Sequence, residues 1–237
     1  MNTHLLHLLS VLFFISVLSG IHAQITQNTP PKEFLKQIRQ PLSKNVWTEI
    51  TGKIVHKKQG ESSLSGDLRL RITFAPTSLH AQIVLNRVNV YGFEQTHNDA
   101  TSDPKPSSKL DMPEKEQSPG LFQFGLTPGD LTFSFLYWDF LEELPEQSSR
   151  FQACRILKLA DPNSDGYAIV WFNKEYGFPM EASWYKKDAK SPWRTLLMKG
   201  AKRFKSGMWF VKEMRLEGKD WKTKVQFDFA ELNKENP

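Results

Sequence analysis

The sequence predicts a mainly β (α+β) domain built on a curved antiparallel sheet or open barrel. Asp67–Phe74 alternates apolar and charged residues, as a strand with one buried face does. After a turn at 75–78, Leu79–Leu85 has the pattern of the returning strand of a hairpin. From Phe151 onward, strand patterns alternate with turns rich in Gly, Pro, Asp and Lys. Helical patterns occur only near the N-terminus and in the middle, which favours one curved sheet with a few helices.

The predicted strands of the second half are Cys154–Leu159, Tyr167–Asn173, Pro179–Tyr185, Thr195–Lys199, Met208–Glu217 and Thr223–Phe229. Both faces of Tyr167–Phe172 are apolar, so we expect helix or ligand to cover this strand on two sides. An amphipathic helix is predicted to begin at Pro31 and to stop at Pro41. Its apolar face carries Phe34, Leu35 and Ile38.

The first residues predict export. Leu5–Leu18 is an apolar run too short for a comfortable membrane span, and Ala23 is a small residue at a suitable cleavage point. We therefore expect a signal peptide over residues 1–23 and a single domain over residues 24–237. Cys154 is the only cysteine, so no intramolecular disulfide can form, and the core must hold the domain. The seven Trp and 17 Phe supply that core.

Charge is unevenly distributed along the chain, whose net charge is +5. Acidic residues dominate His97–Gln147, and within it residues 97–119 are predicted to be a mobile acidic loop with little to bury. Basic residues dominate Lys186–Lys224. An exported protein rarely meets nucleic acid, so this stretch predicts contact with a membrane surface or a membrane protein. A solvated sheet face is the alternative.

Motifs for catalysis or metal binding are weak. Asp161–Gly166 matches the first half of a calcium-binding loop, but Phe172 stands where the bidentate carboxylate belongs, so a hairpin turn is predicted. No G-x-S-x-G sequence is present, and Cys154 lies in the middle of a strand. We therefore expect that the protein is not an enzyme and that it binds neither a metal nor a cofactor. A lipid hydrolase is a less favoured alternative.

The densest aromatic run is Asp130–Phe140, within a predicted helix that begins after Thr127 and ends before Pro145. On a 3.6-residue period its apolar residues cover more than half of the circumference. A helix resting on one sheet needs only a stripe of about 100°. The excess surface therefore faces either a second layer of core or a cavity.

Several segments resemble the outer-membrane lipoprotein-sorting family, the LolA-like periplasmic carriers. These segments are Gly129–Leu136, Arg150–Leu159, Trp171–Pro179, Gly207–Met214 and Gly218–Phe227. The resemblance implies an unclosed, strongly curved antiparallel β-barrel with covering helices. Its apolar interior would hold the acyl chains of lipids or lipoproteins in the periplasm. An arginine closes the lid of the better-known carriers, and the resemblance assigns it to no position in this chain.

On this interpretation the protein is a monomeric lipid carrier. The expected lipid-binding residues are Phe133, Leu136, Trp138, Phe140, Leu141, Trp171 and Trp184. The alternative is an envelope protein-interaction or sensor module that has the same fold and a filled core, without transport.

Overall fold

The computed structural model describes residues 29–39, 46–75, 77–96, 107–203 and 209–234. The predicted signal peptide and the predicted helix stop at Pro41 lie outside these residues. The helical elements are α1 (Pro31–Arg39), η1 (Leu121–Phe124), α2 (Pro128–Thr132) and η2 (Ser134–Tyr137). The strands are β1 (Val46–Lys58), β2 (Leu64–Ala75), β3 (Ser78–Leu85), β4 (Asn89–Thr96), β5 (Ser107–Asp111), β6 (Asp139–Ser149), β7 (Gln152–Ala160), β8 (Tyr167–Asn173), β9 (Pro179–Tyr185), β10 (Arg194–Arg203), β11 (Trp209–Gly218) and β12 (Trp221–Lys234).

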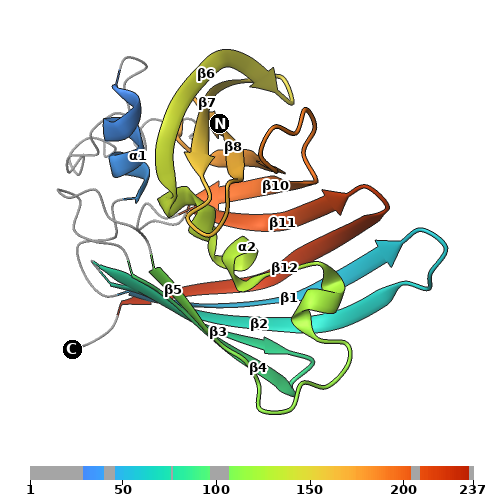
Figure 1. The fold of residues 1–237 in the computed structure, drawn as a ribbon. Coiled ribbons are helices and arrows are strands. Elements are labelled where there is room, and N and C mark those ends of the chain that lie inside the picture. Colours follow the sequence, from blue (N-terminus) through green and yellow to red (C-terminus); the bar gives the residue numbers. More distant parts are fainter. Residues whose placement is uncertain (1–28, 40–45, 76, 97–106, 204–208, 235–237) are drawn as a thin grey trace, which may run out of the picture.

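The described strands form one 12-stranded sheet in the order β5-β4-β3-β2-β1-β12-β11-β10-β9-β8-β7-β6 (Figure 1). All of its strand pairs are antiparallel. The pairing of β1 with β12 brings the first and the last strand together near the centre of the sheet. The sheet is strongly curved and unclosed, with β5 at one edge and β6 at the other. The predicted fold class is thereby confirmed.

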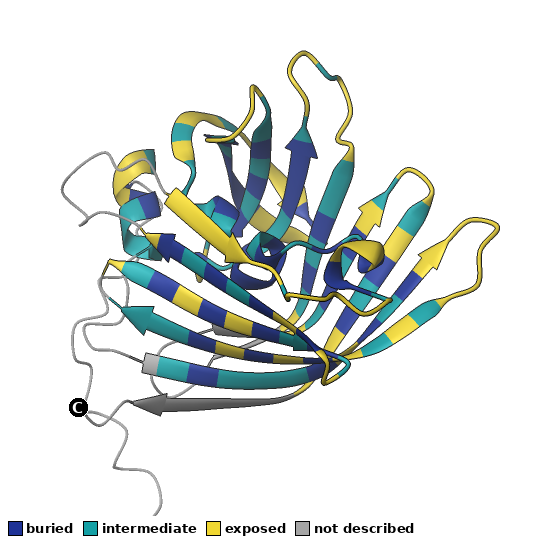
Figure 2. Cartoon of the chain, turned by 60° about the horizontal axis from the view of Figure 1, so that its bottom comes forward, coloured by how far each residue is buried: buried dark blue, intermediate teal, exposed yellow. Residues whose placement is uncertain are grey.

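The two edge strands are consecutive in the sequence, so the chain between them must cross the open side of the sheet. The crossing segment contains η1, α2 and η2, and it lies within the curve of the sheet (Figure 1). We call residues 121–138 the plug. Burial alternates along the strands, and the buried residues gather on the inner surface of the sheet and on the helical segments that it encloses (Figure 2).

Local patterns predicted much of this architecture correctly. The hairpin over 67–85 is β2 and β3, and the helix from Pro31 is α1. The predicted strands of the second half are β7 to β12; the bounds of β8 and β9 are as predicted, and those of the other four are shifted. The segment Asp161–Gly166 is the turn between β7 and β8, in which the Asp161 carboxylate accepts hydrogen bonds from the Asn163 amide and the Ser164 hydroxyl.

The predicted aromatic helix ending before Pro145 is wrong. Helix α2 ends at Thr132 and is capped by Phe133, whose φ of 55° places it in the left-handed region. The segment η2 ends at Tyr137 and is followed by Trp138 in an extended conformation. From Asp139 the chain is strand β6, because it pairs with the free edge of β7. Pro145 fits there, since it lies in an edge strand at a shift of register, where a missing N–H leaves no gap in the ladder.

Residues 97–106 of the predicted mobile loop lie outside the described residues. The remainder of that loop is tied to the sheet. Ser107–Asp111 pairs with β4, and the Asn89 side chain exchanges two hydrogen bonds with the Gln117 backbone, at 2.6 and 2.7 Å. Among the described residues, no helix is long and apolar enough to cross a membrane.

Candidate functional site

The concave face of the sheet is a continuous apolar surface, and the plug covers it. The plug contributes Leu121, Phe124, Leu126, Leu131 and Phe135, all of which are buried against inward-facing strand residues. Large aliphatic side chains from most strands meet them there. The site is therefore an apolar interior that the protein's own side chains fill.

Aromatic rings fix the position of the covering segments. The Phe135 ring meets the Trp184 ring edge-on, with centroids 5.2 Å apart and an interplanar angle of 83°. Phe34 of α1 meets Phe172 of β8 in the same manner at 5.3 Å. Edge-to-face aromatic pairs contribute about 0.5–1.5 kcal/mol beyond their buried area. Both contacts therefore hold helical segments against the sheet.

Two buried polar groups anchor η1. The Tyr91 hydroxyl donates to Glu116 and accepts from the Leu121 amide at 2.8 Å. Burial, followed by the bond to Glu116, raises the pKa of Tyr91 to about 12, so the phenol keeps its proton. The Thr223 hydroxyl donates to the Phe124 carbonyl at 2.5 Å, so His56 Nδ1 must be the donor in its 2.8 Å bond to Thr223.

The end of η1 requires glycine. Gly125 has φ +68°, and a Cβ atom there would lie 2.9 Å from the Trp221 ring. A larger residue would be strained and would also collide with β12. Glycine therefore allows the chain to turn from η1 towards α2 while its backbone stays in close contact with Trp221 of the sheet.

A buried ion pair joins α2 to the sheet. Thr127 and Asp130 form a capping box, in which the Thr127 hydroxyl accepts from the Asp130 amide. The Asp130 carboxylate also lies 3.0 Å from Arg194 of β10, with side chains 1% and 11% exposed respectively. The Arg194 guanidinium lies 4.1 Å from the centre of the Trp184 ring and 4.7 Å from that of Trp193.

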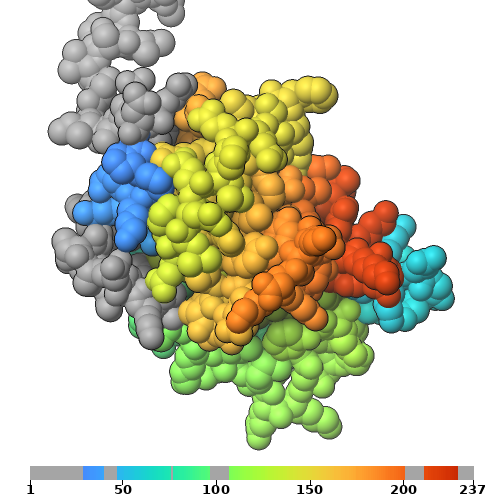
Figure 3. Space-filling view, turned by 45° about the horizontal axis from the view of Figure 1, so that its top comes forward, coloured from blue at the N-terminus to red at the C-terminus, as the bar shows by residue number. Residues whose placement is uncertain are grey.

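Arg39, at the end of α1, ties that helix to the plug. Its guanidinium donates to the Leu136 carbonyl at 2.7 Å and to the Trp138 carbonyl at 2.5 Å. Burial lowers the pKa of Arg39 from its ordinary value, while Tyr137 and Asp139 oppose that shift. The space-filling view shows α1 lying directly against the yellow-green chain that enters β6 (Figure 3).

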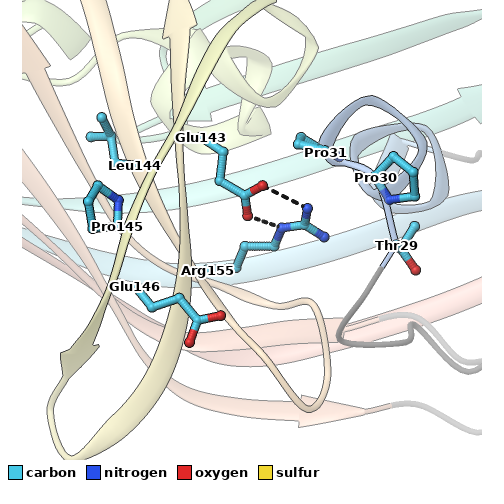
Figure 4. A pocket seen from close by; sticks show the side chains of 8 residues that line it. All are labelled: Thr29, Pro30, Pro31, Glu143, Leu144, Pro145, Glu146 and Arg155. Atoms are coloured by element: carbon cyan, nitrogen blue, oxygen red, sulfur yellow. Dashed lines mark hydrogen bonds and ion pairs between the residues drawn. The ribbon is translucent and has the colours of Figure 1, made fainter.

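An open pocket of about 560 Å³ lies between the start of α1 and strands β6 and β7 (Figure 4). It is lined by Thr29, Pro30, Pro31, Glu143, Leu144, Pro145, Glu146 and Arg155. Arg155 holds Glu143 through two hydrogen bonds of 2.5 and 3.0 Å, and its guanidinium lies 4.7 Å from the centre of the Phe34 ring. No residue of the plug lines this pocket, and charged side chains contribute to its walls, so it is distinct from the apolar interior.

The expected lipid-binding residues fall into two groups. Trp184 belongs to the buried core, and Phe133, Leu136, Trp138 and Phe140 are half-buried against it. Leu141 is 50% exposed on β6. Trp171 is half-buried and lies on the opposite face of the sheet from its neighbours Val170 and Phe172, beside Ile156 and Glu181. The structure thus brings five of these residues to the interior and leaves two outside it.

Sequence reasoning missed the polar groups of the interior. Arg39 bonds a carbonyl 97 positions away, and Arg194 pairs with a carboxylate 64 positions away. Only the capping box at Thr127-Pro128-Gly129-Asp130 is visible as a local motif. No local signal identifies the two arginines, since the basic stretch around Arg194 is otherwise largely exposed lysine.

An unclosed, curved antiparallel sheet with an apolar concave face covered by short helices defines the LolA-like fold class. Comparison with solved structures places the chain in that class. A structure described as an outer membrane lipoprotein-sorting protein domain from Vibrio parahaemolyticus matches with a TM-score of 0.58 and 12% identity, over 79% of this chain and 85% of that one. The resemblance inferred from the sequence is thus confirmed at the level of the fold.

Two further structures support the same class. A DUF1329 family protein from Desulfovibrio piger has a TM-score of 0.61 and 14% identity, over 84% of this chain and 89% of that one. A LolA superfamily protein from Nitrosomonas europaea has a TM-score of 0.55 and 12% identity, over 86% and 92%. No family model matches the sequence, and no curated protein matches it significantly. At these identities the likeness concerns the fold alone.

Proposed function

We propose that this protein is a periplasmic lipid-binding carrier of the outer-membrane lipoprotein-sorting type, and that it holds acyl chains against the concave face of its sheet. The observation that carries this proposal is the way the apolar face is covered. A plug made of helical segments of four or five residues covers it, in place of a second sheet or long helices. Such short segments have little stability of their own and depend on their contacts with the sheet.

Acyl chains can replace the plug energetically. Burying a methylene group stabilises by about 0.8 kcal/mol, so a sixteen-carbon chain gains roughly 12 kcal/mol before costs. Displacing the plug exposes side chains such as Phe124 and Phe135, which are fully buried in the closed structure. In the closed state the plug covers the apolar face, and in the open state acyl chains would cover it instead. Because both states bury apolar surface, a ligand can shift the equilibrium from the closed to the open state. No catalytic residue is required for this function.

Arg39 is the group best placed to control opening. It joins α1 to the end of the plug, so the plug cannot leave the sheet without losing both of its hydrogen bonds to Arg39. We therefore propose that Arg39 acts as the latch that keeps the plug closed.

Contact with a membrane surface or membrane protein is the second part of the proposal. The turns β9–β10 and β11–β12 lie at the same end of the sheet, since both follow strands that run in the same direction. They present exposed lysines, among them Lys186, Lys187 and Lys219, beside the half-exposed Trp193. This composition suits an anionic head-group layer. The proposal also includes export of the protein, with residues 1–23 acting as its signal peptide.

The filled interior favours one alternative, a protein-interaction module of the same fold that transports nothing. Uptake of a fluorescent fatty acid by the protein without residues 1–23 separates the two. The carrier proposal predicts saturable uptake that an unlabelled fatty acid displaces. The absence of uptake would instead support the interaction module.

The Arg39→Ala variant sharpens this test. A hydrogen bond from a charged donor contributes about 1.5–3 kcal/mol, and every 1.4 kcal/mol is about tenfold in an equilibrium constant. We therefore expect Arg39→Ala to raise the apparent affinity for the probe about tenfold or more, by easing plug release. Lys32→Ala, on the exposed face of α1, is the matched control and should leave affinity unchanged. Equal affinities in both variants would remove Arg39 from the opening step.

A further inference from the structure

A charged group lies at one end of the apolar interior. Arg194 is directly opposite Trp184 in the β9–β10 ladder and continues the inward-facing row of Leu196 and Met198. Its guanidinium lies against the Trp184 and Trp193 rings, and the Trp193 amide donates to the Trp184 carbonyl at 2.9 Å. The sheet itself therefore holds this cation in place, independently of the plug.

The pairing of Arg194 with the plug is incomplete. One oxygen of Asp130, Oδ2, accepts from the Thr127 amide, the Thr127 hydroxyl and the Arg194 guanidinium, at 2.8, 2.8 and 3.0 Å. Arg194 thus receives a single shared oxygen, although a guanidinium can engage two oxygens of a carboxylate or phosphate at once. A carboxylate or phosphate that offers two free oxygens would therefore pair with this guanidinium more completely than Asp130 does.

Unused donors support the same conclusion. The Arg194 Nε–H and the Trp184 indole N–H are buried without any acceptor. Trp184 is only 4% exposed, and its ring contacts the Arg194 guanidinium. Buried donors normally find partners, so each one left without a partner calls for an explanation. Here two neighbouring buried donors, one of them on the Arg194 guanidinium itself, lack an acceptor in the closed structure.

We propose that Arg194 and Trp184 form a binding site for the anionic group of an acyl ligand, a carboxylate or a phosphate, and that Asp130 occupies this site while the interior is closed. This inference rests on the proposed carrier function and adds the chemical class of the cargo. Release of α2 removes Asp130 and leaves Arg194 as an uncompensated cation in an apolar wall. A ligand with its own anionic group restores the pairing, so an anionic amphiphile is bound more tightly than a neutral one of equal length.

The same arrangement couples binding to opening. Asp130 and the ligand anion compete for one guanidinium, so the ligand stabilises only the open state. Removing the Asp130 charge should therefore favour anionic ligands, and removing the Arg194 charge should abolish their advantage. A merely structural ion pair predicts neither effect.

Three probes with the same sixteen-carbon chain test this inference: hexadecanoate, hexadecyl phosphate and hexadecanol. We expect the wild-type protein to bind the better of the two anions at least tenfold more tightly than hexadecanol, measured by displacement of a fluorescent probe below micelle-forming concentrations. A preference for hexadecanoate indicates a free carboxylate ligand, and a preference for hexadecyl phosphate indicates a phospholipid head group.

Two variants and a control complete the test. Arg194→Gln should lower the affinity for the preferred anion to that for hexadecanol. Asp130→Asn, which keeps an acceptor for Thr127, should widen the ratio between anion and alcohol. Lys190→Gln, an exposed cation just before β10, should change neither. Circular dichroism identifies any variant that fails to fold, and Asp130→Asn tests the inference independently of Arg194→Gln.

The outcomes separate this inference from the function on which it rests. Equal wild-type affinities for all three probes, or an equal loss for all three in Arg194→Gln, would overturn the anion site while leaving lipid binding intact. If no probe binds to any variant, the carrier function fails and the anion site fails with it.

Discussion

Phe151 occupies a position that costs the fold free energy. It and Arg150 form the β6–β7 turn with φ values of +65° and +49°, and its ring is fully exposed. Each non-glycine residue in the left-handed region costs about 1–2 kcal/mol. Arg150 compensates through hydrogen bonds from its guanidinium to the carbonyls of Met198 and Met180, at 2.9 and 3.5 Å.

Replacing Phe151 with glycine should stabilise the protein. The Phe151→Gly variant relieves the strain of a positive φ, and we expect the free energy of unfolding to rise by about 1 kcal/mol. Urea denaturation measures this change. Phe151→Ala removes the ring but keeps the Cβ atom, so its gain should be smaller. A lower stability in Phe151→Gly would show that the ring contributes contacts of its own.

Glu181 makes stability depend on pH. Burial raises the pKa of this carboxyl on the outer face of β9, while the Ser149 hydrogen bond and the Arg150 charge oppose the shift. A carboxyl whose pKa is higher in the folded state binds protons more tightly there, so folding stability falls as pH rises from about 4.5 through the raised pKa.

The Glu181→Gln variant should lack this dependence. We expect its advantage in free energy of unfolding over the wild type to grow between the ordinary glutamate pKa and neutral pH, and then to level off. Chemical denaturation at a series of pH values measures it, with the exposed Glu217→Gln as control. A constant difference across this pH range would contradict a raised pKa for Glu181.

At the level of elements, alternation predicted those strands whose inward positions are consistently apolar. The inward face of β2 carries Leu68, Leu70 and Ile72, and its pattern is therefore plain in the sequence. Strand β1 has buried Thr48 and His56 among its inward positions, and β4 has buried Asn89 and Gln95. Asn89 bonds to the loop before the plug and Gln95 to the plug itself, while His56 bonds to Thr223, which anchors η1. Polar side chains at inward positions break the apolar alternation, so no periodicity revealed them.

The aromatic run shows how tertiary contacts override local periodicity. Its residues fit a helix by spacing, yet the free edge of β7 takes 139–149 as a strand. The apolar side chains of the run are nevertheless used in packing, because the run supplies the later part of the plug and the start of β6. Pairing at a sheet edge depends on residues far away in the chain, which no local pattern encodes.

The plug owes its stability to residues such as Phe135. We expect Phe135→Ala to lower the free energy of unfolding by about 3–5 kcal/mol, because it leaves a cavity between η2 and Trp184. Leu141→Ala, on the exposed part of β6, should change it by less than about 0.5 kcal/mol. Thermal or urea unfolding measures both. Similar losses in the two variants would mean that the plug is not packed as described.

At the scale of the whole molecule, the sheet is unclosed, with edges at β5 and β6, and the plug covers its concave face. The order of strands requires the chain to connect the two edges from β5 to β6, and the connecting segment lies within the curve of the sheet (Figure 1). Polar contacts at Tyr91, Thr223, Arg194 and Arg39 are spaced along that segment. This arrangement suits a cover that detaches as a unit when its contacts are broken.

Native mass spectrometry of the protein purified from its own host tests the central claim, that the apolar interior accepts acyl chains, most directly. The account predicts a bound species with the mass of an acyl lipid, lost when the protein is unfolded and regained when it is incubated with the extracted lipid. A single species at the mass of the protein alone, before and after incubation with lipid, would contradict it and would identify the interior as a permanently filled core.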